Sequence, residues 1–331
     1  MSGLRTICGL RGEIRARKGS LVVICMLFLQ ALLLLASPSM AHAAEGSILV
    51  VSNGKAAVYS ELVSDLQSNL AGHCDATYDC PATGYSLDYR SNSEQLSIPP
   101  DTVLIITLGA KAAQLVAEWD NDVPVVHALI SKASNGQLVH GHRHLSLFLD
   151  QPISRQLRLA RLVRQDPRLG VLLGPSSKGY LQPLRSEADH QGIPMSYRQL
   201  GDESQVGPLL KELLEENNIL LALPDPLIFN RKTIFNILLS SYHNKVPVIG
   251  FSAAYVKAGA LIAAFSSPRD IASHLADIIR SHTVSGSGVT PGIMYPKYFS
   301  IAINHSVARS LGISLPDEAD IVRLIRQESD R

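Results

Sequence analysis

The segment from Ile219 to Ser252 restricts the possible folds of this chain more than any other. It opens with a continuous apolar run at 219–223, which is typical of a strand buried on both faces. A Pro-Asp-Pro turn at 224–226 ends that run, because proline cannot donate a hydrogen bond to a sheet. A helical spacing of apolar residues follows, and then a second apolar run at 246–250. The pattern predicts a strand, a crossover helix and a strand, which is the connection that two parallel strands require.

The same alternation of strand and helix patterns recurs along most of the chain, and it predicts an α/β fold. We expect two doubly wound, Rossmann-like lobes joined by a hinge. The first lobe covers residues 44–150 and is completed by about 266–331, and the second covers 151–265. The polar segment 131–143 and the alternating residues that follow it are interpreted as the crossing between the lobes. Predicted strands lie at 47–52, 85–89, 101–108, 124–130, 170–173, 195–200, 219–223, 246–250, 259–265 and 298–303, and predicted helices at 58–70, 112–119, 153–163, 180–190, 206–216, 271–279 and 305–311.

The N-terminal region has the pattern of a secretory signal peptide. Five basic residues precede an almost wholly apolar run at 21–36, and Ala41-His42-Ala43 supplies the small residues that signal peptidase reads. We expect residues 1–43 to be removed after Ala43 and the protein to reside in the periplasm. The alternative is an uncleaved membrane anchor, although the apolar run is short of the roughly 20 residues that a span needs.

The cysteines and the net charge further restrict which class of protein this chain belongs to. Cys74 and Cys80 lie close together in a polar stretch, and in an exported chain such a pair predicts a disulfide. The 30 basic and 29 acidic residues give a net charge of +1. This balance offers no electrostatic case for binding nucleic acid. After removal of the signal, no further apolar run is long enough for a membrane span.

Candidate ligand-binding residues follow the predicted strands, because ligands of open parallel sheets bind outside the carboxyl ends of the strands. Backbone N–H groups at 109–111 are suited to a carboxylate or phosphate, or they form only a tight turn. Asp225 either pairs with a ligand ammonium or caps the next helix. Phe251 or Phe265 either stacks on an aromatic ligand or belongs to the core. The complete set is Asn53, Gly109, Ala110, Lys111, Ser131, Ser176, Ser177, Asp225, Phe251 and Ser252.

His140, His142 and His144 alternate, so on a strand they would share one face. Three imidazoles are able to bind zinc or copper, but a solvated hairpin explains the same pattern and we expect no metal site. The chain shows no nucleophile and base set, no Walker loop and no G-x-G-x-x-G motif. We therefore expect neither an enzyme nor a cofactor.

Several motifs, in this order and spacing, resemble the substrate-binding proteins of ABC transporters with the periplasmic type I fold, in particular the branch that includes binders of aromatic amino acids. The resemblance covers nearly the whole chain after the signal peptide. It implies a monomeric receptor that captures a small molecule, such as an amino acid, between two lobes and delivers it to an inner-membrane ABC permease. The motifs are DTVLIITLGAKAA at 101–113, LALPD at 221–225, KVPVIGFS at 245–252, VKAGAL at 256–261 and INHSVARSLGISLP at 303–316.

Two positions depart from the pattern of that family. Residues 131–134 read Ser-Lys-Ala-Ser where the family usually has an Asp-Pro turn, and Gly174-Pro175 stands where it often has Asn-Pro. The identity of the ligand is therefore not implied by the resemblance. The alternatives are a regulatory or accessory protein with the same fold and no transport role, and a metal receptor that uses His140, His142 and His144.

Overall fold

The computed structural model of the chain describes residues 46–71, 86–91, 98–119, 122–136, 143–285 and 289–329. The predicted signal peptide, Cys74, Cys80, His140 and His142 lie outside the described residues. The described residues form one compact unit built around two sheets, and the expected two-lobe α/β fold is confirmed.

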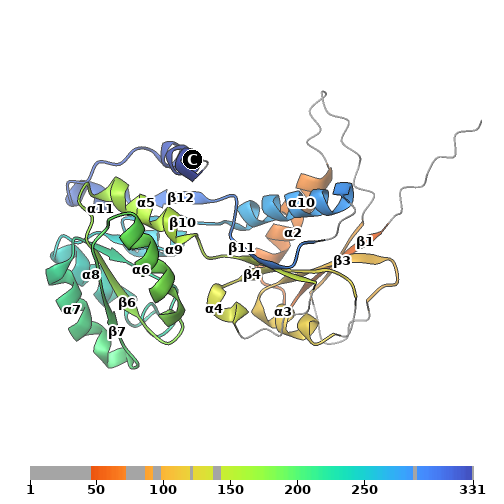
Figure 1. Cartoon of the computed structure of the whole chain (residues 1–331), viewed down its shortest axis with the longest axis horizontal. Helices are drawn as coiled ribbons and strands as arrows, with labels where there is room; N and C mark the ends of the chain where they lie inside the picture. Colours follow the sequence, from red (N-terminus) through yellow and green to blue (C-terminus); the bar gives the residue numbers. More distant parts are fainter. Residues whose placement is uncertain are drawn as a thin grey trace, which may run out of the picture. The chain divides into compact units, whose positions relative to one another are not determined.

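The first sheet, which defines the first lobe, has α-helices on both faces because its strands are apolar on both faces. Ile48 and Val50 pack against α2 (Ala57–Ala71) and α10 (Pro268–Ser285), whereas Leu49 and Val51 pack against α3 (Ala110–Ala117). Figure 1 shows α2 and α10 running side by side over this sheet. All neighbouring strands are parallel, and their order is β11 (Gly292–Met294), β5 (His144–Phe148), β4 (Val125–Ile130), β3 (Thr102–Leu108), β1 (Ser47–Ser52) and β2 (Ser86–Arg90).

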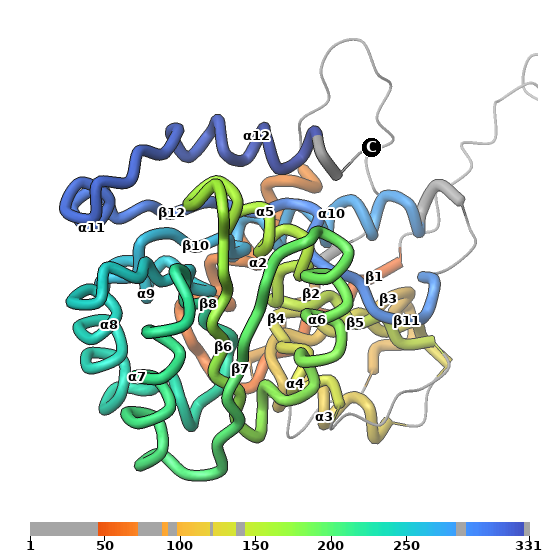
Figure 2. Tube along the Cα trace, turned by 60° about the vertical axis from the view of Figure 1, so that its left-hand side comes forward, coloured from red at the N-terminus to blue at the C-terminus, as the bar shows by residue number. Residues whose placement is uncertain are grey.

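The second sheet defines the second lobe, and it also has α-helices on both faces because its strands are apolar on both faces. In β6 (Leu169–Leu173), Val171 faces α5 (Ile153–Val163), α6 (Leu181–His190) and α12 (Glu318–Ser329), whereas Leu172 faces α7 (Val206–Glu216) and α8 (Ile234–His243). Figure 2 traces α12 alongside β12 (Ser300–Ile303), on which it packs. The strand order is β12 (Ser300–Ile303), β10 (Ile262–Phe265), β9 (Val248–Gly250), β8 (Ile219–Leu221), β6 (Leu169–Leu173) and β7 (Met195–Gln199), with only β12 antiparallel among these pairs.

The residues at which the chain crosses from one sheet to the other differ from those predicted from the sequence. β5 is a full strand of the first sheet rather than part of the crossing. Residues 266–331 do not all return to the first lobe, since β12 extends the second sheet and α12 packs on it, whereas α10 and β11 belong to the first. Helix α11 (His305–Ser310) begins where Asn304 caps it by accepting a hydrogen bond from the Val307 N–H.

Four short or terminal elements were absent from the sequence prediction. Three of them, α4 (Lys132–Asn135), α9 (Ala253–Ala258) and β11, have six residues or fewer and bury at most one side chain each. They are too short to show a hydrophobic period. Helix α12 did carry a signal, because Ile321 and Ile325 are spaced as on one helical face and both are buried.

Three short segments of the described chain join the lobes, at 149–152, 266–267 and 295–299, and hydrogen bonds link them to one another. The Gln151 amide donates to the Ser266 hydroxyl at 3.0 Å, and that hydroxyl donates to the Tyr298 carbonyl at 2.8 Å. The Arg155 guanidinium donates to the Pro296 carbonyl and lies 3.9 Å from the ring centre of Phe299. These contacts define the hinge, and the candidate site lies beside it.

Candidate functional site

Asp225, the most diagnostic residue of the predicted site, is buried and hydrogen-bonded within its own lobe. Its Oδ2 accepts from the backbone N–H groups of Ser176 and Ser177 at 3.0 and 2.8 Å and from the Ser177 hydroxyl at 2.8 Å. Its Oδ1 accepts from the Leu227 N–H at 3.0 Å. Only 2% of Asp225 is exposed. The carboxylate therefore holds the loop after β6 against the turn after β8, and it does not cap the next helix, because α8 begins at Ile234 with Thr233 at its N-cap position.

Gly174 explains why the carboxylate fits there. A Cβ at this position would lie 2.7–2.8 Å from the carboxylate atoms of Asp225. A side chain at position 174 and this placement of Asp225 therefore exclude each other. Ser177 is fully buried and its hydroxyl also accepts from the Gly174 N–H at 2.9 Å, whereas Ser176 is exposed beside it. The structure brings these residues together as a self-contained cluster.

The candidates of the first lobe lie at the carboxyl edge of its sheet. The Gly109 N–H donates to the Ala128 carbonyl, and φ of 88° at Gly109 is a conformation that favours glycine. A Cβ there would lie 2.7 Å from the Tyr59 hydroxyl. Ala110 and the exposed Lys111 open α3, and Asn53 follows β1. None of these four candidates lines the cavity described next.

A cavity of about 330 Å³ lies at the carboxyl end of the second sheet, beside the hinge. Three of the predicted residues line it, namely Ser131, Phe251 and Ser252. Most of the other residues that line the cavity are apolar. The lining residues are Ser131, Leu149, Asp150, Gln151, Ile153, Gln156, Tyr180, Leu184, Leu221, Ala222, Leu223, Pro224, Phe251, Ser252, Phe265 and Ser266.

Ser131 reaches the cavity because β4 ends irregularly. Leu129 has φ of 55°, which is uncommon for a residue with a side chain, and the register between β4 and β5 shifts between His127 and Ile130. After this bulge the Ser131 hydroxyl caps α4 by accepting from the Ser134 N–H at 3.1 Å. Residues held in such uncommon backbone conformations cluster at active sites and ligand-binding sites.

Asp150 contributes the single carboxylate among the lining residues, and it is already engaged. It accepts from the Lys132 N–H at 2.6 Å and from the Tyr180 hydroxyl. Burial and the neighbouring Asp150 raise the pKa of Tyr180 far above its ordinary value, so Tyr180 remains a donor. Asp150 thus connects α4 of the first lobe with Tyr180 of the second, and each of its oxygens already accepts one hydrogen bond.

Gln156 is the most unusual polar residue of the cavity, and the sequence prediction did not include it. It lies in the first turn of α5 and is 5% exposed. Its Oε1 is buried without a hydrogen-bond partner among the described residues. A buried polar atom left in this way costs about 1–3 kcal/mol, so such atoms are rare in native proteins. No sequence signal marked it, since a glutamine on a helix is ordinarily solvated.

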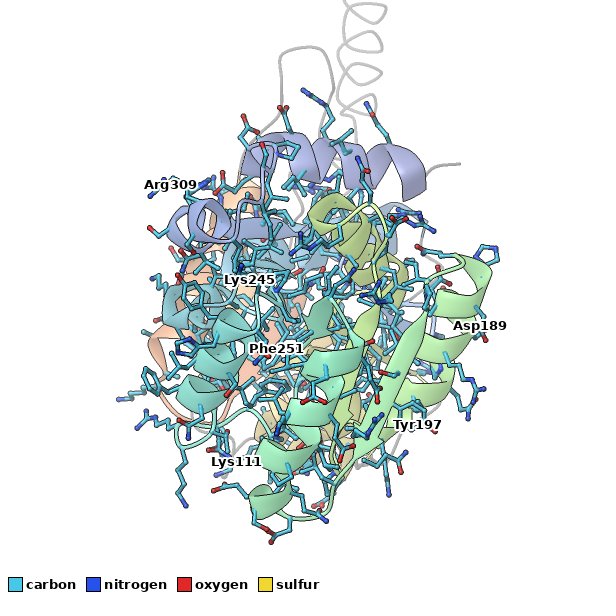
Figure 3. The ribbon with its side chains drawn as sticks, turned by 90° about the vertical axis from the view of Figure 1, so that its left-hand side faces the viewer. Lys111, Asp189, Tyr197, Lys245, Phe251 and Arg309 are labelled. Carbon is cyan, nitrogen blue, oxygen red and sulfur yellow. The ribbon has the colours of Figure 1, made fainter. Side chains whose placement is uncertain are left out.

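Two phenylalanines give the cavity aromatic walls. The Phe251 ring lies 4.3 Å from that of Tyr255 and 6.0 Å from that of Phe229, centre to centre, and both Phe251 and Phe265 are half-buried. Figure 3 shows Phe251 among the side chains in the middle of the view, with Asp189 at the outer edge of the second lobe. Phe251 is therefore part of the core and of the cavity wall at once.

His144 lies on a strand of the first sheet, where the sequence had suggested a solvated hairpin. His144 belongs to β5 and its Nδ1 lies 3.3 Å from Nε2 of His127, whose Nδ1 lies 2.8 Å from the Thr107 hydroxyl. Within the described ranges, no group of three His, Cys, Asp or Glu side chains could hold a metal ion. Among the described helices, none is long and apolar enough to cross a membrane.

Comparison with known proteins supports the fold and leaves the ligand open. No protein-family model and no curated sequence matches the chain. A ligand-free, open substrate-binding protein with adhesive properties from Clostridium difficile superposes with a TM-score of 0.63 at 15% identity, covering 82% of this chain and 96% of that one. An ABC domain in complex with L-Trp from Streptococcus pneumonia gives 0.53 at 17% identity, with 84% and 98% covered. A conserved domain protein from Vibrio cholerae gives 0.53 at 16% identity, with 84% and 97% covered.

Proposed function

We propose that this protein is a solute-binding receptor that captures a small molecule in the cavity beside the hinge. The observation that carries the proposal is a mostly apolar cavity at the carboxyl edge of a parallel sheet, lined by an amide whose oxygen has no partner among the described residues. Ligands of such sheets bind at this edge, and binding cavities typically combine apolar walls with few polar groups. The likeness in fold to a substrate-binding protein and to an L-Trp complex supports the same role.

The proposal extends to the cellular setting that the sequence predicted. The receptor acts in the periplasm after removal of residues 1–43, as a monomer, and passes its solute to an inner-membrane ABC permease. The three hinge connections support this role, because bending at a few connecting residues is how two lobes close over a ligand. An aromatic solute is favoured by Phe251 and Phe265, which line the cavity.

A thermal-shift screen of the exported protein tests the proposal. The screen covers amino acids, aromatic amides, nucleosides, sugars and divalent metals. A solute at a hundredfold excess over its Kd stabilises the folded state by about 2.7 kcal/mol, which raises Tm by several degrees.

Ser252→Tyr provides the variant for the screen. The Ser252 side chain lines the cavity and makes no capping hydrogen bond, so a larger side chain fills the space at little cost to α9. We expect the variant to fold and to lose the ligand-dependent shift. A folded protein that no solute class stabilises would contradict the proposed function.

A further inference from the structure

We infer that the cavity selects an uncharged, largely apolar ring compound with an amide-like or hydroxyl group, and that the side-chain amide of Gln156 recognises that group. The inference rests on the proposed function and specifies its ligand.

The first step concerns charge. No lysine or arginine is among the residues that line the cavity. Asp150, its one carboxylate, already accepts from the Lys132 N–H and from the Tyr180 hydroxyl. A ligand carboxylate would lie beside the Asp150 carboxylate with no lysine or arginine among the lining residues to balance it, and a ligand ammonium would share Asp150 with the two donors that it already accepts from. Burying an uncompensated charge is strongly unfavourable, so an uncharged ligand fits this lining best.

The second step concerns the hydrogen bond that such a ligand offers. Oε1 of Gln156 lacks a partner among the described residues although 95% of the residue is buried. Rotation about the last side-chain bond turns either the carbonyl or the NH₂ group of the amide toward the ligand. A primary or cyclic amide presents the complementary donor and acceptor side by side. The ligand therefore supplies the hydrogen-bond partner that Oε1 of Gln156 lacks among the described residues.

The third step concerns shape. Phe251 and Phe265 stand at the carboxyl ends of β9 and β10, which are adjacent strands of the second sheet. Leu184, Leu221 and Leu223 complete an apolar wall. Aromatic side chains favour offset-stacked or edge-on contacts with a second ring. The hydroxyl of Ser252, which makes no capping bond, adds one uncharged polar contact.

Three indole compounds test the charge preference on the exported protein: indole-3-acetamide, which is neutral, indole-3-acetate, which is an anion, and L-tryptophan, which is a zwitterion. Calorimetric titration with each compound is expected to give the lowest Kd for the amide. A lower Kd for the acetate or for tryptophan, or no binding of the amide at millimolar concentration, overturns the inference. If the wider screen then finds a charged solute whose binding Ser252→Tyr abolishes, the proposed function stands and only this inference falls.

Gln156→Met tests the role of the amide, with Gln165→Met as the control on an exposed glutamine two residues beyond the end of α5. Methionine keeps the length of the side chain and removes the unpaired polar atom. We expect the free variant to have an equal or higher Tm, and its Kd for indole-3-acetamide to rise about 5- to 100-fold. The control is expected to change neither quantity. A lower Tm with an unchanged Kd would show that Gln156 is structural, and would overturn its role in recognition.

Discussion

Replacing Asp225 by asparagine separates a structural role from a ligand-binding role, because the two predict opposite results. In the structure the two carboxylate oxygens of Asp225 accept four hydrogen bonds, three at Oδ2 and one at Oδ1. An asparagine keeps one oxygen, which is able to serve the donors from Ser176 and Ser177. Its NH₂ group then faces the N–H of the half-buried Leu227, so that a donor meets a donor.

The magnitude follows from these contacts. One unsatisfied buried donor costs about 1–3 kcal/mol, and the three remaining bonds weaken because a neutral acceptor replaces a charged one. We expect Asp225→Asn to lower the free energy of unfolding by about 2–4 kcal/mol. Asp225→Ala removes all four acceptor contacts, and we expect a loss of more than about 4 kcal/mol, in the range of broken buried networks. The Kd of any solute that the screen identifies should be unchanged in the asparagine variant, since Asp225 does not line the cavity.

Thermal unfolding and calorimetric titration of the same samples provide the assay. Asp189→Asn is the matched control, because Asp189 is exposed on the same lobe (Figure 3). Gly174→Ala supplies a second perturbation of the same contact, since its Cβ would meet the Asp225 carboxylate, and the two changes should be non-additive. An asparagine variant with wild-type Tm and a weakened Kd would refute the reasoning and return Asp225 to the binding site.

Three further predictions follow from the hinge, from a buried histidine and from the cysteines. Ser266→Ala removes both the bond from Gln151 and the bond to the Tyr298 carbonyl, and we expect a loss of about 1–2 kcal/mol, with faster hydrogen exchange at the hinge than in Ser204→Ala, where the serine is exposed. Burial lowers the pKa of His274 below its ordinary value, against the opposing effect of Asp277 and with a smaller lowering by Lys297. The unfolded chain therefore binds the proton more readily, and stability present above about pH 6.5 should be lost as the pH falls below it. His274→Gln should flatten that decline in Tm, and parallel pH profiles of variant and wild type would contradict this account. For Cys74 and Cys80 we still predict a disulfide, so mass spectrometry without reductant should find no free thiol in exported protein.

The order of strands and helices was accessible from the sequence because it depends on local patterns. Helix α7 is predicted and observed at the same residues, and β1 at 47–52, because each repeats its own hydrophobic period over its whole length. The Pro-Asp-Pro turn after 219–223 likewise placed Asp225 at the end of a strand. Local patterns also favoured two lobes, and the two separate sheets confirm it.

Which strands share a sheet was decided by tertiary contacts. β12 and α12 return to the second lobe because Phe299 and Ile325 complete its core, and nothing in their own periodicity specifies that partner. The same holds at the candidate site. The strand-end rule selected Ser131, Phe251 and Ser252, which line one cavity. It also selected Asp225 and Ser177, which hydrogen-bond to each other within the second lobe.

By itself, the sequence determined the α/β class, the alternation of elements and the strand ends at which polar residues gather, since each depends on spacing along a few turns of chain. Only the tertiary structure decided which of those residues face the cavity and which are occupied within the lobe. It also revealed Gln156, whose importance lies in the partner that its amide oxygen lacks among the described residues. A missing hydrogen bond is a property of the packed surroundings of an atom, and no pattern of residue types encodes it.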